Sequence, residues 1–255
     1  CMQNSRYEIK FLISTRAIPE LLDSLKGVMK NKSPNTKTNR YINRSIYFDT
    51  HKLRFYREKQ EGLKSRSKPR LRIYLNPQTS TPQKFFLEIK SKDDRVSTKS
   101  RIELQLQDAK KLLDEKIHQI KTPEVINNDT FSYFQYLQCK YLLKPKLTIQ
   151  YHRQALSSDL YPNLRLTIDT SLKTSINTKF DIMDGDFVYI LSPNYSLVEL
   201  KYQNKFPTFI SAIAKKHELK QATFSKYSSG IEALYEKFRI GQRYRHDQFN
   251  SGIKL

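Results

Sequence analysis

The sequence contains little glycine, little cysteine and no tryptophan. Its six Gly form neither a GxxxxGKS/T nor a GxGxxG motif, which argues against a phosphate cradle built from backbone amides. Cys1 and Cys139 are the only cysteines, so a disulfide framework is excluded and a reducing compartment fits. The five His show no HxxxH or HExxH spacing, and this argues against a zinc site.

Long apolar runs are also absent. No stretch reaches the length that a membrane-spanning helix needs, and we expect no signal peptide. We therefore expect a cytoplasmic protein, with peripheral attachment to a membrane through a partner as the alternative.

Acidic residues are few relative to basic ones. There are 25 Asp and Glu against 46 Lys and Arg, which gives a net charge of +21. Such a chain attracts polyanions: nucleic acid, anionic membranes or phosphate-rich small molecules. No linker or solenoid repeat divides the 255 residues. We expect one α+β domain over residues 6–238, followed by a polar tail over 239–255.

Most of the predicted strands alternate between apolar and ionic residues. In Pro69 to Leu75, the pattern places Arg70 and Arg72 on one face and the leucines and isoleucine on the other. Helical spacing predicts helices over 18–29, 108–120, 209–217 and 227–238, the second of them on the surface. Polar, Pro-containing or Lys-rich stretches predict loops over 65–69, 76–83 and 91–100. The predicted strands are 6–11, 45–49, 69–75, 85–90, 101–106, 147–153, 164–169 and 198–201.

A solvated sheet face is one explanation of this alternation. Three features favour a second explanation, in which the charged face is enclosed by the sheet. Arginine, whose planar fork grips phosphate, occurs near strand centres. Carboxylates share the cationic faces, and separate amphipathic helices need the apolar faces for packing. Together they predict a closed or nearly closed antiparallel sheet with charges inside. Its cations would neutralise a triphosphate, and Mg²⁺ or Mn²⁺ would join the phosphates to the carboxylates.

Seven short motifs follow one another along the chain. They are Arg6 to Lys10 (RYEIK), Pro69 to Tyr74 (PRLRIY), Phe86 to Lys90 (FLEIK), Tyr151 to Arg153 (YHR), Leu164 to Asp169 (LRLTID), Val198 to Lys201 (VELK) and Phe224 to Tyr227 (FSKY). In this order they resemble the catalytic domain of the vacuolar transporter chaperone (VTC) polyphosphate polymerases, which are triphosphate tunnel metalloenzymes. The resemblance covers roughly Arg6 to Phe238.

The resemblance implies an antiparallel β-barrel with surrounding helices, which transfers the terminal phosphate of ATP to a growing polyphosphate chain with Mn²⁺ or Mg²⁺. It implies Glu199 as metal ligand; Glu8 is a second candidate, with pairing to Lys10 or an arginine as its alternative. The implied catalytic phosphate ligands are Lys10, Arg70, Arg72, Lys90, Arg153, Arg165 and Lys226. The implied further substrate-binding residues are Tyr151, Lys99, Arg101 and Ser225.

The chain departs from the wider superfamily at one position and from this family at another. Arg6 stands where the wider superfamily has the first Glu of ExExK, as in the VTC branch, and Thr223 stands where the family often has Lys. The SPX domain and membrane helices of the eukaryotic complex are missing, so we expect a stand-alone form, with a separate membrane protein as an open partner.

Two other functions stay open from the sequence. One is a tripolyphosphatase or nucleoside triphosphatase in the same tunnel; the other is a non-catalytic polyphosphate or polyanion binder. Specific nucleic-acid binding is disfavoured, because the aromatic residues alternate to the face opposite the cations and carboxylates occupy the cationic face.

Overall fold

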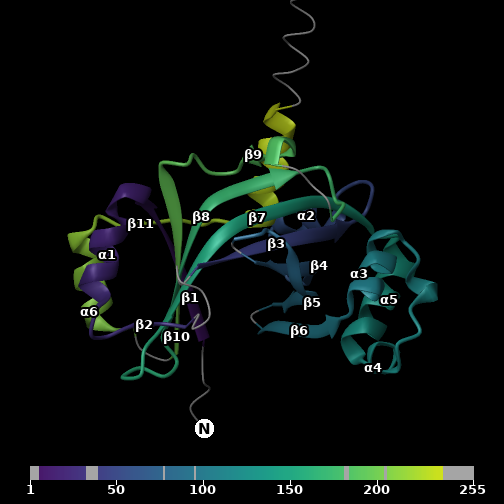
Figure 1. Ribbon diagram of the computed structural model, residues 1–255, viewed down its shortest axis with the longest axis horizontal. Coiled ribbons are helices and arrows are strands. Elements are labelled where there is room, and N and C mark those ends of the chain that lie inside the picture. Colours follow the sequence, from purple (N-terminus) through teal and green to yellow (C-terminus); the bar gives the residue numbers. More distant parts are fainter. Residues whose placement is uncertain are drawn as a thin grey trace, which may run out of the picture.

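The computed structural model describes residues 6–32, 40–76, 78–94, 96–180, 184–203 and 206–237. A large, strongly curled sheet forms the centre, and helices flank it on both sides (Figure 1). The expected α+β class with an antiparallel sheet is confirmed. The predicted C-terminal tail, 239–255, lies outside the described residues.

All paired strands in the sheet are antiparallel. The hydrogen-bonded order is β11-β1-β10-β8-β7-β3-β4-β5-β6, with β2 on β7 and β9 on β8. Within the described ranges, no pairing joins β6 to β1 or β11, so the expected barrel is an open, curled sheet. The strands are β1 (Arg6–Ser14), β2 (Lys30–Asn31), β3 (Arg40–Asp49), β4 (Arg66–Leu75), β5 (Pro82–Asp93), β6 (Val96–Leu104), β7 (Lys144–Ser157), β8 (Arg165–Ser175), β9 (Val188–Tyr189), β10 (Tyr195–Gln203) and β11 (Lys220–Gln221).

Helices cover the convex side of the sheet at both ends of the strand order. One group packs on β1, β8 and β10, and the other on β3, β4 and β5 (Figure 1). The first group is α1 (Ile18–Leu25) and α6 (Thr208–Lys216). The second is α2 (Arg54–Gln60), α3 (Leu106–Leu113), α4 (Pro123–Ile126) and α5 (Asp129–Tyr141); short 3₁₀ turns are η1 (Thr15–Ala17), η2 (Ile117–Gln119) and η3 (Asp184–Asp186).

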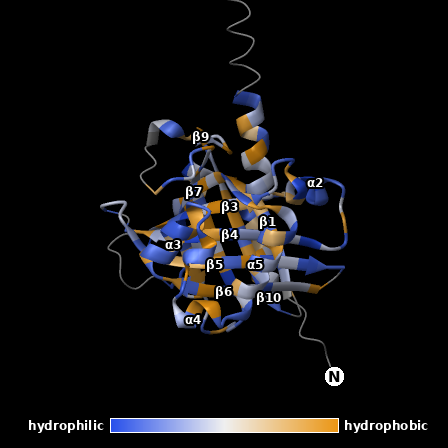
Figure 2. Cartoon of the chain, turned by 90° about the vertical axis from the view of Figure 1, so that its right-hand side faces the viewer, coloured by the Kyte–Doolittle hydropathy of each residue, from blue (hydrophilic) through white to orange (hydrophobic). Residues whose placement is uncertain are grey.

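The convex side of the sheet is built from the apolar positions of the strands, which alternate with the polar ones. Leu71, Ile73, Leu87 and Ile89 are at most 1% exposed and pack against the second helix group. Figure 2 shows hydrophobic and hydrophilic residues mixed along β3 to β6, as alternation requires. Burial of these side chains therefore fixes which residues of the same strands face the inside of the curl.

A last helix, over residues 226–237, packs on the concave side. Its Tyr227 and Ile231 join an apolar cluster with Tyr151 and Leu197 of the sheet. A side chain at Gly230 would come within 3.2 Å of Thr174 Oγ1 and 3.3 Å of Ile149 Cδ1, so glycine permits the close approach of helix and sheet. This apolar cluster covers part of the concave face and leaves the charged part beside the first turn of the helix.

Several predicted boundaries are wrong. The stretches 65–69 and 91–100 are largely strand, because β4 begins at Arg66 and β5 and β6 extend the hairpin to Asp93 and Val96. The predicted helix over 108–120 is the shorter α3, whose Ala109 and Leu112 are buried in the core. α2 and α5 were not expected from the sequence.

Candidate functional site

Charged side chains from seven strands, β1, β4, β5, β6, β7, β8 and β10, share the concave face. Since alternate residues of a strand point to the same side, the register of each pair identifies them. Arg70 pairs with Glu88 and Glu88 with Arg101, while Arg153 pairs with Asp169. Further charged positions in these alternations are Glu8, Lys10, Arg66, Lys68, Arg72, Lys84, Lys90, Lys92, Lys99, Glu103, Arg165, Glu199 and Lys201.

Glu88 is the centre of the first ionic cluster and is 1% exposed. Arg70 Nε and Nη2 donate to Glu88 Oε2 at 2.9 and 2.7 Å. Arg72 Nε lies 3.4 Å from the same oxygen, and Lys99 Nζ lies 2.6 Å from Oε1. Arg70 also donates to Tyr47 Oη at 2.9 Å. One buried carboxylate therefore holds three of the predicted cations together.

Asp169 and Glu199 form the second ionic cluster. Arg153 Nε and Nη2 donate to the two carboxylate oxygens of Asp169, both at 2.6 Å, and Nη2 reaches Glu199 at 3.1 Å. Lys226 Nζ lies 2.6 Å from Glu199 and 2.8 Å from Asp169. Lys226 begins the helix over 226–237, so that helix closes the cluster from above the sheet.

Tyr151 connects the two clusters. Arg72 Nη2 lies 3.4 Å from the Tyr151 hydroxyl oxygen. Arg153 and Lys226 sit over its ring, 5.1 and 5.0 Å from the centroid. A buried aromatic ring thus separates the two groups of cations and contacts both.

One carboxyl group in each cluster, Glu88 in the first and Glu199 in the second, is held ionised. Burial raises the pKa of Glu88, but Arg70 and Arg72 outweigh burial and lower its pKa to about 2. Burial likewise opposes ionisation of Glu199, while Lys226 and Arg153 hold its pKa well below its usual range. Asp169 and Glu199 in turn raise the pKa of Lys226 despite its burial. Glu88, Glu199 and Lys226 are therefore charged at neutral pH.

Asp49 anchors the helix that carries Lys226. This fully buried carboxylate accepts from Tyr227 Oη and from the backbone N–H groups of Phe55 and Tyr56 at the start of α2. Ser225 precedes the helix, and its hydroxyl oxygen lies 3.4 Å from the Ser228 N–H as an N-cap. Packing and capping together fix the position of Lys226 over Asp169 and Glu199.

The remaining predicted residues lie around these clusters. Lys10 Nζ donates to the Phe224 carbonyl at 2.7 Å, and Glu8 pairs with Lys10 and Lys201 rather than with an arginine. Arg101 stacks over Phe86 at 4.6 Å. Lys90 and Arg165 are exposed, and neither forms an ion pair with a described residue. They stand at the edge of the charged face, outside both clusters.

Sequence reasoning missed two members of this face. Asp169 was not among the predicted site residues, yet it pairs with Arg153 and Lys226. Lys68 continues the alternation of Arg70 and Arg72, but the assignment of 65–69 to a loop hid it. Its Nζ lies 3.3 Å from Ser225 Oγ.

The donors present fit a hard divalent cation bound with phosphate. Among the described residues, no group of three His, Cys, Asp or Glu forms a complete cage. Glu199 and Asp169 both contact Lys226 Nζ, so their oxygens converge. One or two carboxylates that share the ion with substrate phosphates are typical of Mg²⁺. Glu8 forms its ion pairs with Lys10 and Lys201.

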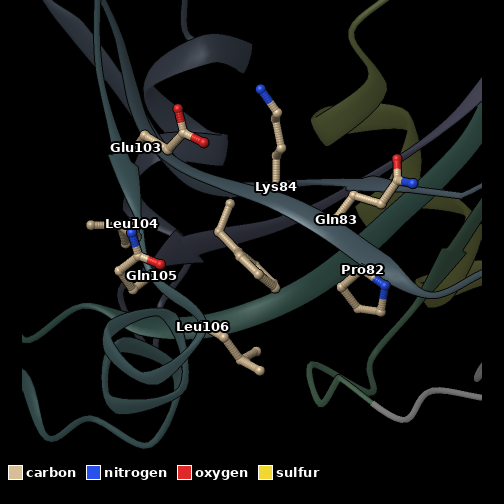
Figure 3. A pocket seen from close by; sticks show the side chains of 8 residues that line it. Pro82, Gln83, Lys84, Glu103, Leu104, Gln105 and Leu106 are labelled. Carbon is tan, nitrogen blue, oxygen red and sulfur yellow. The ribbon is translucent and has the colours of Figure 1, made fainter. Parts of the chain in front are cut away.

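A hollow at one end of the concave face contains no residue of the two ionic clusters. Figure 3 shows it at the ends of β5 and β6, where Pro82, Gln83 and Leu106 help to line it. Lys84 and Glu103 are its charged lining residues, and it contains none of the predicted phosphate ligands. The two ionic clusters, rather than this hollow, carry the candidate chemistry.

Replacement of Glu88 by Gln tests the first cluster through stability. A carboxyl whose pKa falls from 4.5 to about 2 on folding stabilises the protein above pH 4.5, and this stabilisation is lost as pH falls through 2. Glu88→Gln should therefore lower the free energy of unfolding by roughly 3 kcal/mol at neutral pH. Urea unfolding should show this difference shrinking between pH 4.5 and 2; a constant difference would contradict the account.

No helix within the described ranges combines the length and the apolar character needed to span a bilayer.

The chain is similar to several solved structures and to one family model. No curated protein matches the chain. Among solved structures, a presumed adenylate cyclase from Bacillus halodurans matches with a TM-score of 0.52 and 15% identity, over 87% of this chain and 94% of that chain. It shares the fold of the curled sheet.

Two further structures match with lower scores. A Pyrococcus horikoshii protein matches with a TM-score of 0.44 and 13% identity, over 89% of this chain and 99% of that one. A chain of the Schizosaccharomyces pombe Mediator head module matches with a TM-score of 0.41 and 9% identity, over 83% and 90%.

The family comparison covers nearly all of the described chain. The model of the VTC domain matches residues 5–235, which include every strand of the sheet and the first turns of the last helix. The chain belongs to the VTC domain family, whose triphosphate tunnel fold it shares.

Proposed function

We propose that this domain is a polyphosphate polymerase, which transfers the terminal phosphate of ATP to an inorganic polyphosphate chain. The observation that carries the proposal is the pair of ionic clusters on either side of Tyr151. Arg70 and Arg72 come from one side, and Arg153 and Lys226 from the other. Membership of the VTC domain family supports the same reaction.

The cations are arranged for an exchange of partners. In the free protein, Glu88, Asp169 and Glu199 neutralise them. A triphosphate offers oxygens that suit the forks of Arg70 and Arg153 at least as well as a carboxylate does. The phosphate then replaces the carboxylates as the hydrogen-bond partner of the arginines. The fixed cations balance the charge that spreads over the transferred group.

In the proposed reaction, a terminal oxygen of the polyphosphate attacks the γ-phosphorus of ATP. The bond between that phosphorus and the β–γ bridging oxygen breaks, and ADP leaves. Phosphoryl transfer asks the protein mainly for positioning and charge neutralisation. Arg72 and Lys226 hold the phosphates, and the Tyr151 hydroxyl donates a hydrogen bond to one of them.

Mn²⁺ or Mg²⁺ is part of this proposal. Glu199, with Asp169 beside it, would hold the ion. When bound, a divalent ion neutralises phosphate charge and aligns the oxygens of the reacting groups. A cytoplasmic location and a separate membrane protein as partner remain predictions.

The products of an incubation with ATP and Mn²⁺ test the proposal. We expect polyphosphate on a gel and stoichiometric ADP, with both lost without the metal. Orthophosphate without polymer would instead identify a hydrolase that uses water as acceptor. Triphosphate binding without any product would identify a binding domain, and either outcome would overturn the polymerase.

A further inference from the structure

Cations lie directly opposite one another where β4 meets β5, beyond the Glu88 cluster. Lys68 pairs in register with Lys90, and Arg66 pairs with Lys92. Arg66 and Lys68 continue the alternation of Arg70 along β4, and Lys90 and Lys92 continue that of Glu88 along β5, so all four belong to the concave face. We call these two pairs, together with Arg70 and Glu88, the β4–β5 ladder. Like charges directly opposite on neighbouring strands are destabilising. The arrangement therefore has an electrostatic cost, which Glu8 offsets only in part, because it raises the pKa of Lys90 while burial and neighbouring cations lower it.

Neutralisation differs between the steps of this ladder. Arg70 has Glu88 2.7 Å away. No carboxylate of a described residue forms an ion pair with Lys68, Lys90, Arg66 or Lys92. Lys68 is half-buried, and burial together with Lys59, Lys90, Arg66 and Lys10 lowers its pKa to about 8. An anion between these side chains would relieve both the repulsion and the burial of charge.

The spacing of the ladder indicates what kind of anion fits. Successive steps lie two residues apart, which is about 6.6 Å along a strand. One phosphate cannot contact all of them, whereas a linear polyanion that continues from Arg70 can. Lys68 Nζ also lies 3.3 Å from Ser225 Oγ, beside Lys226, so the ladder is continuous with the second cluster as well.

We propose that the pairs Lys68–Lys90 and Arg66–Lys92 form a second anion subsite, which binds the phosphates of a chain that extends beyond the three held near Tyr151. This inference rests on the proposed function. It assigns phosphate binding to Lys68, Arg66 and Lys92. Through β4 and β5, the affinity of the domain for polyphosphate therefore depends on chain length.

The test compares two ligands in one variant. Arg66→Gln/Lys92→Gln should lower the affinity for long-chain polyphosphate at least roughly tenfold more than the affinity for tripolyphosphate, as measured by calorimetry at one salt concentration. The salt dependence of long-chain binding should also become shallower, because fewer counterions are displaced. Lys68→Met should change the same ratio in the same direction.

Lys110→Gln/Lys121→Gln removes the same charge from exposed positions away from the ladder and should leave the ratio unchanged. Melting temperatures establish that each variant is folded. If the ladder variant and this control both lose affinity equally for long-chain polyphosphate and for tripolyphosphate, the subsite is overturned. The cations would then act only through the general electrostatic field of the protein. A wild-type protein that binds neither ligand would overturn the proposed function together with the subsite.

Discussion

Arg72→Ala should reduce kcat/KM for ATP by about 10²–10³-fold, the largest effect of any single substitution. Arg72 is buried, its Nε has no hydrogen-bond partner among the described residues, and its guanidinium reaches both Glu88 and Tyr151. It therefore stands between the two clusters with bonding capacity to spare. Steady-state kinetics and tripolyphosphate binding measure the loss.

The positive charge of Arg72 alone does not account for its expected contribution. Arg72→Lys keeps the charge but loses the planar fork, so it should recover only part of the activity. Lys110→Ala, on the exposed side of α3, serves as the control for the loss of one cation. An Arg72→Ala protein that melts normally and turns over ATP at the wild-type rate would show that Arg72 only holds Glu88.

Glu199→Gln should separate metal use from phosphate binding. The metal concentration for half-maximal turnover should rise at least roughly tenfold. Tripolyphosphate binding without metal should stay the same or become tighter, because Lys226 and Arg153 lose a competing carboxylate. Metal titrations of turnover and metal-free calorimetry give the two numbers.

The matched control is Glu103→Gln, an exposed carboxylate on the same face, which should change neither quantity. A purely structural role for Glu199 predicts a different result. In that case the variant would lose stability and phosphate affinity together, while the metal requirement of the residual activity would not change.

Alternation in the sequence predicts the composition of the charged face but not its pairing. A strand period of two places Arg70, Arg72 and Glu88 on one side without any structural information. The partners of Asp169 depend on the register of β7 against β8 and on a helix that begins some 60 residues later. Such contacts arise from tertiary packing, which local patterns do not encode.

The wrong boundaries have a related cause. The stretch 91–100 contains Ser, Lys and Asp, which are typical of loops, yet it forms the exposed end of a long hairpin that its neighbours hold in register. α5 buries Phe131, Phe134 and Leu137 at a spacing of three, so its periodicity could have been recognised. The predicted phosphate ligands remain predictions, since the geometry brings together only part of them.

The most direct test is a crystal structure with tripolyphosphate and Mn²⁺, in which anomalous scattering locates the metal. The account predicts phosphates within hydrogen-bond distance of Arg70, Arg72, Arg153 and Lys226, and manganese beside Glu199. Phosphates bound outside the concave face, with the Glu88 and Asp169 clusters unchanged, would contradict it.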